Sequence, residues 1–138
     1  MKRTALMLGM TLLVGICLGV IGAQLLNAQP QPVKRTLLLK TALAGMEGKE
    51  AILALAEIAP GAATDKHIHL GHEFAYVLEG SGSLEIEGKP SVAMTPGTAI
   101  YQPPRQVHRG MNDSTTTPLK IFTLYIVDEG QPLTEPVK

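Results

Sequence analysis

The sequence predicts an all-β domain, built as a sandwich or a barrel, that follows an N-terminal apolar helix. The chain has 138 residues, a length that suits one domain. Its 14 glycines and 10 prolines lie among many aliphatic residues, which favours short strands joined by frequent turns. After residue 28, apolar runs recur at short, nearly regular intervals without a long helical pattern, as in small sandwiches and barrels.

The N-terminal segment, residues 1–28, is predicted to be either a signal peptide or a membrane anchor. Met1-Lys2-Arg3 is a short basic start, and residues 5–23 then carry no charge. As a helix this run would span about 28 Å, close to the thickness of the hydrocarbon core of a bilayer. Cleavage after Ala28 would release the domain, whereas an uncleaved segment would tether it to the inner membrane through residues 5–26. In both cases the domain is expected to be periplasmic or secreted.

The charge balance argues against nucleic acid as a partner. The chain has 12 Lys+Arg and 12 Asp+Glu, so its formal net charge is zero, which excludes a strongly basic nucleic-acid binder. The single cysteine, Cys17, lies in the apolar run of the N-terminal segment. The exported domain therefore has no disulfide to stabilise it.

The barrel is expected over residues 36–128, after a polar, proline-bearing linker over residues 29–35. It opens with two apolar runs, 36–43 and 50–58, which we interpret as a strand pair. A helix competes for the second run because Ala and Leu favour helices. The Pro60-Gly61 turn that follows favours a strand instead.

Further strands complete the predicted barrel. The runs 74–78 and 83–87 are joined by the Gly-rich segment 79–82, which we interpret as a hairpin. Three more strands are predicted along the chain, at residues 98–102, 107–111 and 120–127, and the last of them is the most apolar. Residues 129–138 contain two prolines and are expected to form an irregular C-terminal tail. Both faces of 120–127 are apolar, so one face can fill the barrel and the other can meet a second subunit, which predicts a homodimer.

The histidines form the pattern in this sequence that points most directly to chemistry. Side chains alternate along a strand, so His67 and His69 point to the same face. A turn at Leu70-Gly71 would let Glu73 begin the next strand and face back towards them. His72 has the opposite parity to Glu73 and should point away. These side chains are therefore candidates for a shared site.

His108 comes from a later strand and can join this site only if the sheet curls round. Two or three imidazoles with one carboxylate and no thiolate suit one divalent transition metal such as Fe, Mn, Ni, Cu or Zn. Four ligands leave one or two positions open in a five- or six-coordinate ion, as catalysis requires. Spacing alone leaves a second interpretation open, in which the histidines are ordinary strand residues without a metal.

Two long spacing patterns resemble the motifs of the cupin superfamily. The first motif, G-x5-H-x-H-x3,4-E-x6-G, is matched at every fixed position by Gly61, His67, His69, Glu73 and Gly80. The second motif, G-x5-P-x-G-x2-H-x3-N, is matched by Gly97, Pro103, His108 and Asn112. It departs once, because Arg105 stands where a glycine is expected. That glycine is a turn residue, so the departure concerns the local turn and not the metal.

The resemblance implies a small antiparallel β-barrel of the jelly-roll type, also called a double-stranded β-helix, with a metal inside one end. It also implies that the metal ligands are His67, His69, Glu73 and His108. Glu73 is in addition a candidate catalytic base, because a carboxylate can leave the metal and take a proton.

Three residues near these ligands are candidates for substrate contact. Gln102 is a polar residue in a short apolar strand, and it either orients groups at the metal or faces water. Arg105 and Arg109 flank His108 and form either an anion-binding rim for a carboxylate or enolate, or ordinary solvated surface. The three tyrosines, Tyr125 included, are expected to be packing residues.

The function expected from this pattern is a metal-dependent oxidoreductase of dioxygenase type that acts on a small organic molecule outside the cytoplasm. Two alternatives stay open. One is a non-enzymatic module that senses a metal or a small ligand. The other is a lyase or isomerase that uses the same metal without O₂. The fold does not select among these, because one fold hosts many chemistries.

Overall fold

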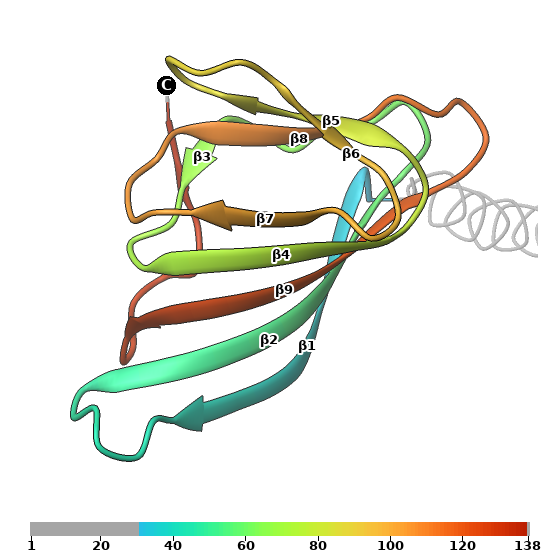
Figure 1. Cartoon of the computed structure of the whole chain (residues 1–138). Coiled ribbons are helices and arrows are strands. Elements are labelled where there is room, and N and C mark those ends of the chain that lie inside the picture. Colours follow the sequence, from blue (N-terminus) through green and yellow to red (C-terminus); the bar gives the residue numbers. More distant parts are fainter. Residues whose placement is uncertain (1–30, 138) are drawn as a thin grey trace, which may run out of the picture. The chain divides into compact units, whose positions relative to one another are not determined.

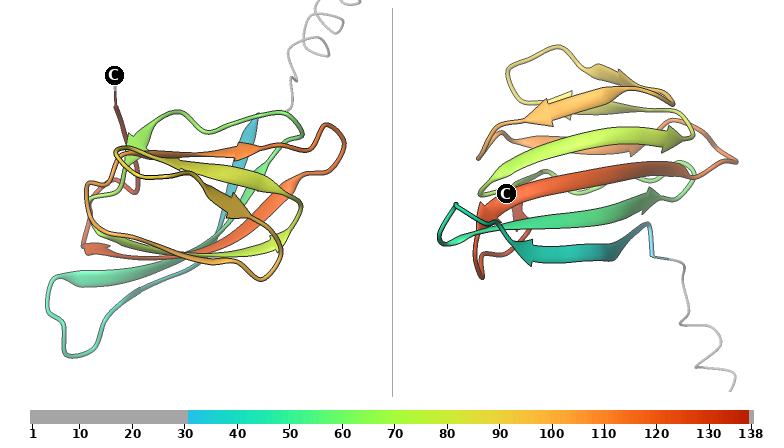
Figure 2. Two further views of the ribbon diagram at one scale, coloured as in Figure 1. Left: turned by 45° about the horizontal axis from the view of Figure 1, so that its top comes forward. Right: turned by 60° about the horizontal axis from the view of Figure 1, so that its bottom comes forward.

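The computed structural model describes residues 31–137, which form two five-stranded antiparallel sheets that face each other (Figure 1). The two views in Figure 2 show these two layers of strands. The all-β jelly roll expected from the sequence is confirmed. The helix, signal peptide and anchor expected over residues 1–28 lie outside the described residues. Across residues 31–137, no helix has the length and apolarity that a membrane crossing requires.

The first sheet contains the long strands. Its order is β1-β2-β9-β4-β7, with every neighbouring pair antiparallel. The strands are β1 (Val33–Ala42), β2 (Lys49–Ile58), β9 (Leu119–Asp128), β4 (His72–Glu79) and β7 (Ala99–Gln102). The strand pair β1–β2 confirms the interpretation of the first two apolar runs as strands and not as helix. β1 starts at Val33, so the end of the expected linker is already strand.

The second sheet contains shorter strands, in the order β10-β3-β8-β5-β6. The strands are β10 (Glu135–Pro136), β3 (His67–Ile68), β8 (His108–Asn112), β5 (Gly82–Ile86) and β6 (Val92–Met94). The short strand β6 was not expected from the sequence. Three residues are too few for an alternating pattern to stand out.

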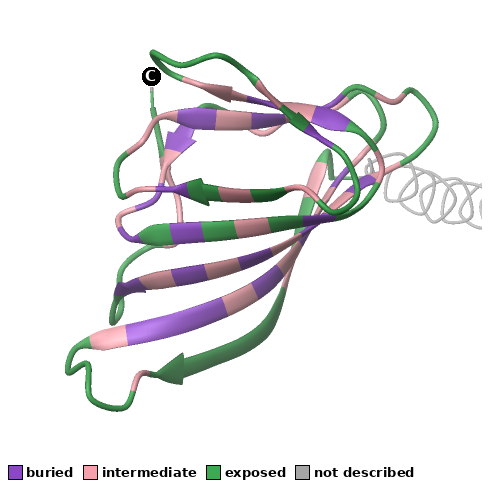
Figure 3. Cartoon of the chain, viewed as in Figure 1, coloured by how far each residue is buried: buried purple, intermediate pink, exposed green. Residues whose placement is uncertain are grey.

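The core lies between the sheets and follows the alternation of the strands. In β9 every second residue from Leu119 to Val127 is buried, and the intervening residues are half-buried (Figure 3). The main buried cluster takes side chains from both sheets, for example Ile58 and Val77 from the first and Leu84 and Met94 from the second. This alternation puts one face of each central strand towards the interior, and it decides which polar residues reach the interior too.

The hairpin expected over 74–87 is wrong, because β4 and β5 belong to different sheets. Residues 79–82 carry the chain across from one sheet to the other. The two glycines let the backbone of this segment lie close to neighbouring parts of the chain. A Cβ atom at Gly80 would clash with the carbonyl oxygen of Pro118, and one at Gly82 would clash with that of Met111. Gly-rich segments suit both a hairpin and such a crossing, which is why the sequence did not separate them.

The C-terminal tail, expected to be irregular over 129–138, is irregular up to Thr134 and then forms the two-residue strand β10. Glu135 and Pro136 pair with Ile68 and His67 of β3, and the Val137 N–H donates to the Lys66 carbonyl at 3.0 Å. A proline can lie on an edge strand, because its missing N–H then faces away from the sheet. The tail therefore forms one edge of the second sheet, directly beside the strand that carries His67.

The outer face of the first sheet is apolar and exposed. Phe74, Tyr76 and Tyr101 are 43%, 47% and 51% exposed. They line one shallow groove together with Phe122 and Leu124 of β9. The homodimer stays a prediction, and this face is the surface on which it can be tested.

Candidate metal centre

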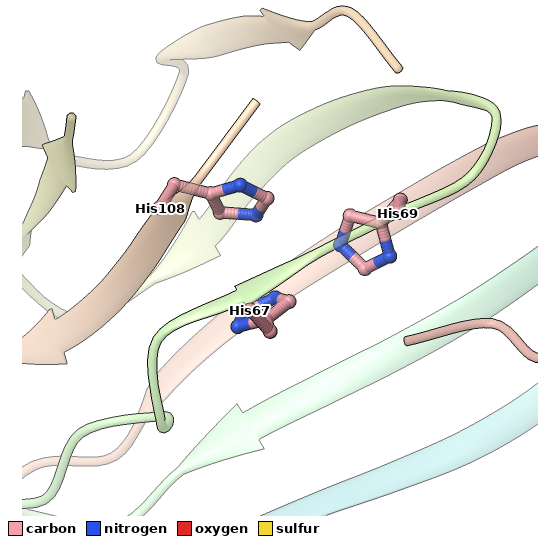
Figure 4. A group of neighbouring side chains, drawn as sticks. All are labelled: His67, His69 and His108. Carbon is pink, nitrogen blue, oxygen red and sulfur yellow. The ribbon is translucent and has the colours of Figure 1, made fainter. Parts of the chain in front are cut away.

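Strand pairing brings three histidines together. His67 of β3 is the register partner of His108 of β8, and His69 follows directly after β3. The ring centroids lie 4.4 to 5.2 Å apart, and the ligand nitrogens all lie within 4.8 Å of one another. Figure 4 shows the three side chains converging. The two separate motifs therefore supply a single buried group that can hold a metal ion.

Each of the three rings is oriented by a main-chain carbonyl. The Nδ1 atom of His67 donates to the Asp65 oxygen at 2.7 Å, and that of His108 donates to the Gln106 oxygen at 2.8 Å. The Nδ1 atom of His69 donates to the Leu133 oxygen at 2.5 Å, across 64 residues. Because a carbonyl only accepts, each Nδ1 carries the proton and each Nε2 presents a lone pair. Such a bond on the far side of the ring is typical of metal-ligating histidines.

Glu73 completes the group from the first sheet. It is buried at the start of β4, and its Oε2 atom lies 3.3 Å from the Nε2 atoms of both His69 and His108. His72, the preceding residue, points away as expected and contacts the Tyr101 hydroxyl at 2.8 Å. Within the described residues, the buried Nε2 atom of His69 has no hydrogen-bond partner. The Nε2 lone pairs and the Glu73 carboxylate oxygen are all electron-rich, and together in a buried site they need a positive charge between them. These residues therefore fit a divalent cation.

The protonation states suit ligation. Burial lowers the pKa of His67 to about 4, so its ring is neutral at neutral pH. Burial would raise the pKa of Glu73, but the imidazoles of His108 and His69 outweigh burial and hold that pKa below its usual range. Burial would lower the pKa of His108, and the Glu73 carboxylate outweighs this and raises it. Metal binding at this site would therefore compete with a proton on His108 and not on His67.

Gln102 faces the interior and not the solvent. It is the register partner of Glu73 in the β4–β7 pair and is 2% exposed. It lines the same cavity as His67, Glu73 and His108. In the described part of the chain, neither its amide nitrogen nor its amide oxygen has a hydrogen-bond partner. A buried amide without partners is costly, so Gln102 is available to a bound group.

Arg109 does not belong to a substrate rim. Since His108 and Gly110 face inwards on β8, Arg109 between them faces outwards. Its Nε and Nη2 atoms pair with the two carboxylate oxygens of Glu85 at 2.7 and 3.0 Å. Of the two interpretations left open for Arg109, the structure supports ordinary surface and not a rim.

Arg105 keeps the turn that the missing glycine would make. It has φ of 64°, in the left-handed region, and its N–H donates to the His69 carbonyl at 2.8 Å. This conformation costs a non-glycine residue about 1 kcal/mol. The side chain is exposed and does not line the cavity that holds the histidines. The departure from the motif thus leaves the local backbone, and with it the His69 segment, in place.

Tyr125 lies next to the candidate site, whereas the sequence analysis expected only a packing residue. It is 1% exposed, it is the register partner of Glu73 in the β4–β9 pair, and its ring centroid lies 4.8 Å from that of His69. Burial raises the pKa of Tyr125 well above its usual range, and the Glu73 charge acts in the same direction. Its phenol is therefore protonated at neutral pH, next to the carboxylate. The strict alternation of 119–127 was the signal that could have assigned it to the interior.

Arg35 was missed by sequence reasoning because it was placed in the linker. It lies on β1 opposite Ala56, an inward-facing residue of β2. Its side chain lines the internal cavity with the histidines and also an outer cavity beside His67. An earlier strand start, at Val33, would have put Arg35 on the inner face by parity.

Comparison with known proteins gives a family and a fold. The sequence profile of the cupin domain matches residues 54–126. No curated protein matches this sequence.

Solved structures resemble the chain at low identity. A cupin-like protein from Thermotoga maritima is 23% identical, with 76% of this chain and 75% of that chain covered and a TM-score of 0.61. The DMSP lyase DddQ from Ruegeria pomeroyi is 16% identical, with coverages of 77% and 52% and a TM-score of 0.62. The polyketide cyclase RemF from Streptomyces resistomycificus is 21% identical, with coverages of 78% and 72% and a TM-score of 0.61. At these identities the likeness concerns the fold.

Proposed function

The chain belongs to the cupin domain family, and from this premise we propose that it is a metal-dependent enzyme acting on a small organic molecule. The observation that carries the proposal is the orientation of the three rings. Each Nδ1 atom is tied to a main-chain carbonyl, so three Nε2 lone pairs converge beside one carboxylate. A buried group of this composition without a cation would leave polar atoms unpaired.

The residues that would hold the metal are His67, His69, Glu73 and His108. One divalent first-row ion bound there supplies a Lewis acid and, if it is iron, manganese or copper, a redox centre. Gln102 offers an unpaired amide to a substrate oxygen in the same cavity. The rest of that cavity wall is largely apolar, and an apolar surrounding strengthens each polar contact inside.

We propose oxidation of dioxygenase type as the reaction, outside the cytoplasm. The proposal rests on the match of all four ligand positions to the cupin motifs and on a cavity with room for a ligand beside them. Residues 1–28, with their basic start and apolar run, support export of the domain.

A lyase or isomerase reaction is the second candidate, and one observation favours it. The Tyr125 phenol, which is protonated at neutral pH, lies on the neighbouring strand opposite Glu73 and next to the His69 ring. A proton donor next to a proton acceptor can serve a reaction that needs no oxidant. Two structures that share the fold are named as a lyase and a cyclase, which is compatible with this candidate.

Metal analysis and oxygen uptake test the proposal. The full-length chain is purified and its metal content is compared with that of His67→Ala. We expect about one divalent ion per chain in the wild type and a large loss in the variant. Oxygen uptake is then followed with catechols, flavonols, β-diketones and thiol acids. A protein that binds no transition metal at neutral pH would falsify the proposal. Turnover without oxygen uptake would select the lyase or isomerase, and metal binding without any turnover would select the sensing module.

A further inference from the structure

Arg35 carries a positive charge to the mouth of the metal cavity. It lines the internal cavity together with His67, Glu73 and His108, and it lines the outer cavity together with His67. Arg35 and His67 therefore lie where the two cavities meet. A ligand that enters from the outer cavity therefore meets the guanidinium and the His67 side chain together.

The other charged groups on the inner face of the first sheet have partners. Lys40, the register partner of Ile52, lies with its Nζ atom 2.9 Å from Oε1 of the buried Glu50. Glu73 contacts two histidines. Among the described residues, Arg35 forms no ion pair, in contrast to Arg109 on the outside, which Glu85 holds through two bonds. The guanidinium at the cavity is thus free to bind an anion.

The C-terminal tail contacts this guanidinium. The Nη1 atom of Arg35 donates to the Thr134 hydroxyl at 3.4 Å. Thr134 follows Leu133, whose carbonyl accepts the hydrogen bond from His69. Consecutive tail residues therefore contact Arg35 and a histidine of the metal centre, so their positions are linked.

The rest of the internal cavity is apolar. Its wall includes Ile58, Leu84, Met94, Ile100 and Ile121. An apolar wall with one cation at its mouth fits a small molecule that has a short apolar body and an anionic end. A bound divalent ion adds two positive charges, which the single Glu73 carboxylate does not balance, so the site as a whole favours an anion.

We propose that the substrate of this site is a small organic acid and that Arg35 binds its carboxylate. The inference rests on the proposed function, because it names the substrate class of the same site. Arg35 is then a specificity-determining residue: its N–H groups bind the carboxylate from the mouth and leave the other end of the molecule to the metal centre.

A ligand pair that differs only in charge tests this inference. Isobutyrate and isobutyramide are titrated into the full-length protein loaded with Co²⁺, and binding is followed by calorimetry. We expect isobutyrate to bind the wild type and Arg35→Gln to weaken that binding by about 10- to 100-fold, as loss of a charge-assisted contact does. Binding of isobutyramide should be equal in the two proteins. Arg35→Lys should recover part of the isobutyrate binding, because the charge remains while the paired N–H donors are lost.

Lys34→Gln is the matched control. Lys34 is the preceding residue on β1, and it faces outwards beside Glu57. This variant removes the same charge from the other face, so isobutyrate binding should stay at the wild-type value. Co²⁺ affinity should be unchanged in Arg35→Gln and Lys34→Gln, since neither side chain is a ligand.

The outcomes separate this inference from the proposed function. If the wild type binds Co²⁺ and isobutyrate binds equally to Arg35→Gln, the carboxylate does not use Arg35 and the inference is overturned. It is also overturned if isobutyrate binds no better than isobutyramide to the Co²⁺-loaded wild type. If the wild type does not bind Co²⁺, the proposed function fails and the inference fails with it.

Discussion

The candidate metal centre and the shell around it come from different parts of the chain. The four candidate ligands all lie between residues 67 and 108, in the two motifs. The shell comes from β1, β9 and the C-terminal tail, which supply Arg35, Tyr125 and Leu133. Two histidines are oriented from within the motifs, by carbonyls two residues away, whereas His69 depends on Leu133. The identity and spacing of the ligands are therefore set by short segments of sequence. The orientation of His69 and the proposed contact with the substrate depend on residues far away in the chain.

The largest effect is expected from loss of a ligand inside the motifs. His108→Ala removes one of three converging nitrogens and leaves Glu73 with one fewer partner. We expect metal affinity to fall by about 100-fold or more, because even removal of an outer partner costs 10- to 100-fold. Metal titration by calorimetry measures this effect. His72→Ala is the control, since His72 points away from the site, and equal losses in the two variants would contradict the assignment.

The next effect is expected from the tail. A chain that ends at residue 132 loses the Leu133 carbonyl, so the Nδ1 atom of His69 loses its acceptor. We expect metal affinity to fall by about 10- to 100-fold, as for loss of other outer-shell partners. A chain that ends at residue 134 keeps this carbonyl and loses only β10, so its affinity should stay close to that of the full-length protein. Similar affinities for the two shortened chains would show that the tail does not orient His69.

A smaller effect is expected from two buried amides that differ in their bonding. Gln102 has no partner in the described structure, whereas Asn112 donates to the carbonyls of Ile58 and Thr117 and accepts from the Ser114 N–H. In the metal-free protein, Gln102→Leu should raise the free energy of unfolding by about 1 kcal/mol, and Asn112→Leu should lower it by about 2 kcal/mol. Urea unfolding gives both values. A loss of stability in Gln102→Leu would mean that Gln102 serves the fold and not a ligand.

The smallest effect is expected from Arg109. Its side chain pairs with Glu85 on the outer face of the second sheet, away from the ligands. Exposed ion pairs contribute little, so Arg109→Gln should leave metal affinity and isobutyrate binding within about twofold of the wild type. Arg35→Gln is measured in the same titrations, so that the loss of isobutyrate binding can be compared between the inner and the outer arginine. Equal losses of isobutyrate binding in both variants would indicate a general effect of charge and not a contact at the mouth.

Spacing and parity predicted the candidate metal centre because each depends on few residues. The His67-x-His69 pair, the turn before Glu73 and the inward position of His108 follow from the alternation of side chains in strands. The same parity argument, applied to the neighbour of an inward-facing residue, would have turned Arg109 outwards.

The shell was harder to predict because it depends on strand ends and on tertiary contacts. Arg35 lies at the start of β1, where strand boundaries are least distinct in a sequence. The tail contains two prolines, which disfavour a strand unless it lies on an edge, and only the fold creates that edge. The Gly-rich segment 79–82 suits a hairpin locally, and only the placement of β4 and β5 in different sheets shows that it is a crossing.

Residues on the apolar outer face of the first sheet can report spectroscopically on ion binding at the site on the other side of the sheet. The chain has only two phenylalanines, and both of them, Phe74 and Phe122, line the groove on this face. Fluorinated phenylalanine would therefore give two ¹⁹F resonances from one surface. Phe74 adjoins Glu73 in the sequence, so its resonance should shift when the ion binds, whereas dilution should move both resonances if two copies share this face.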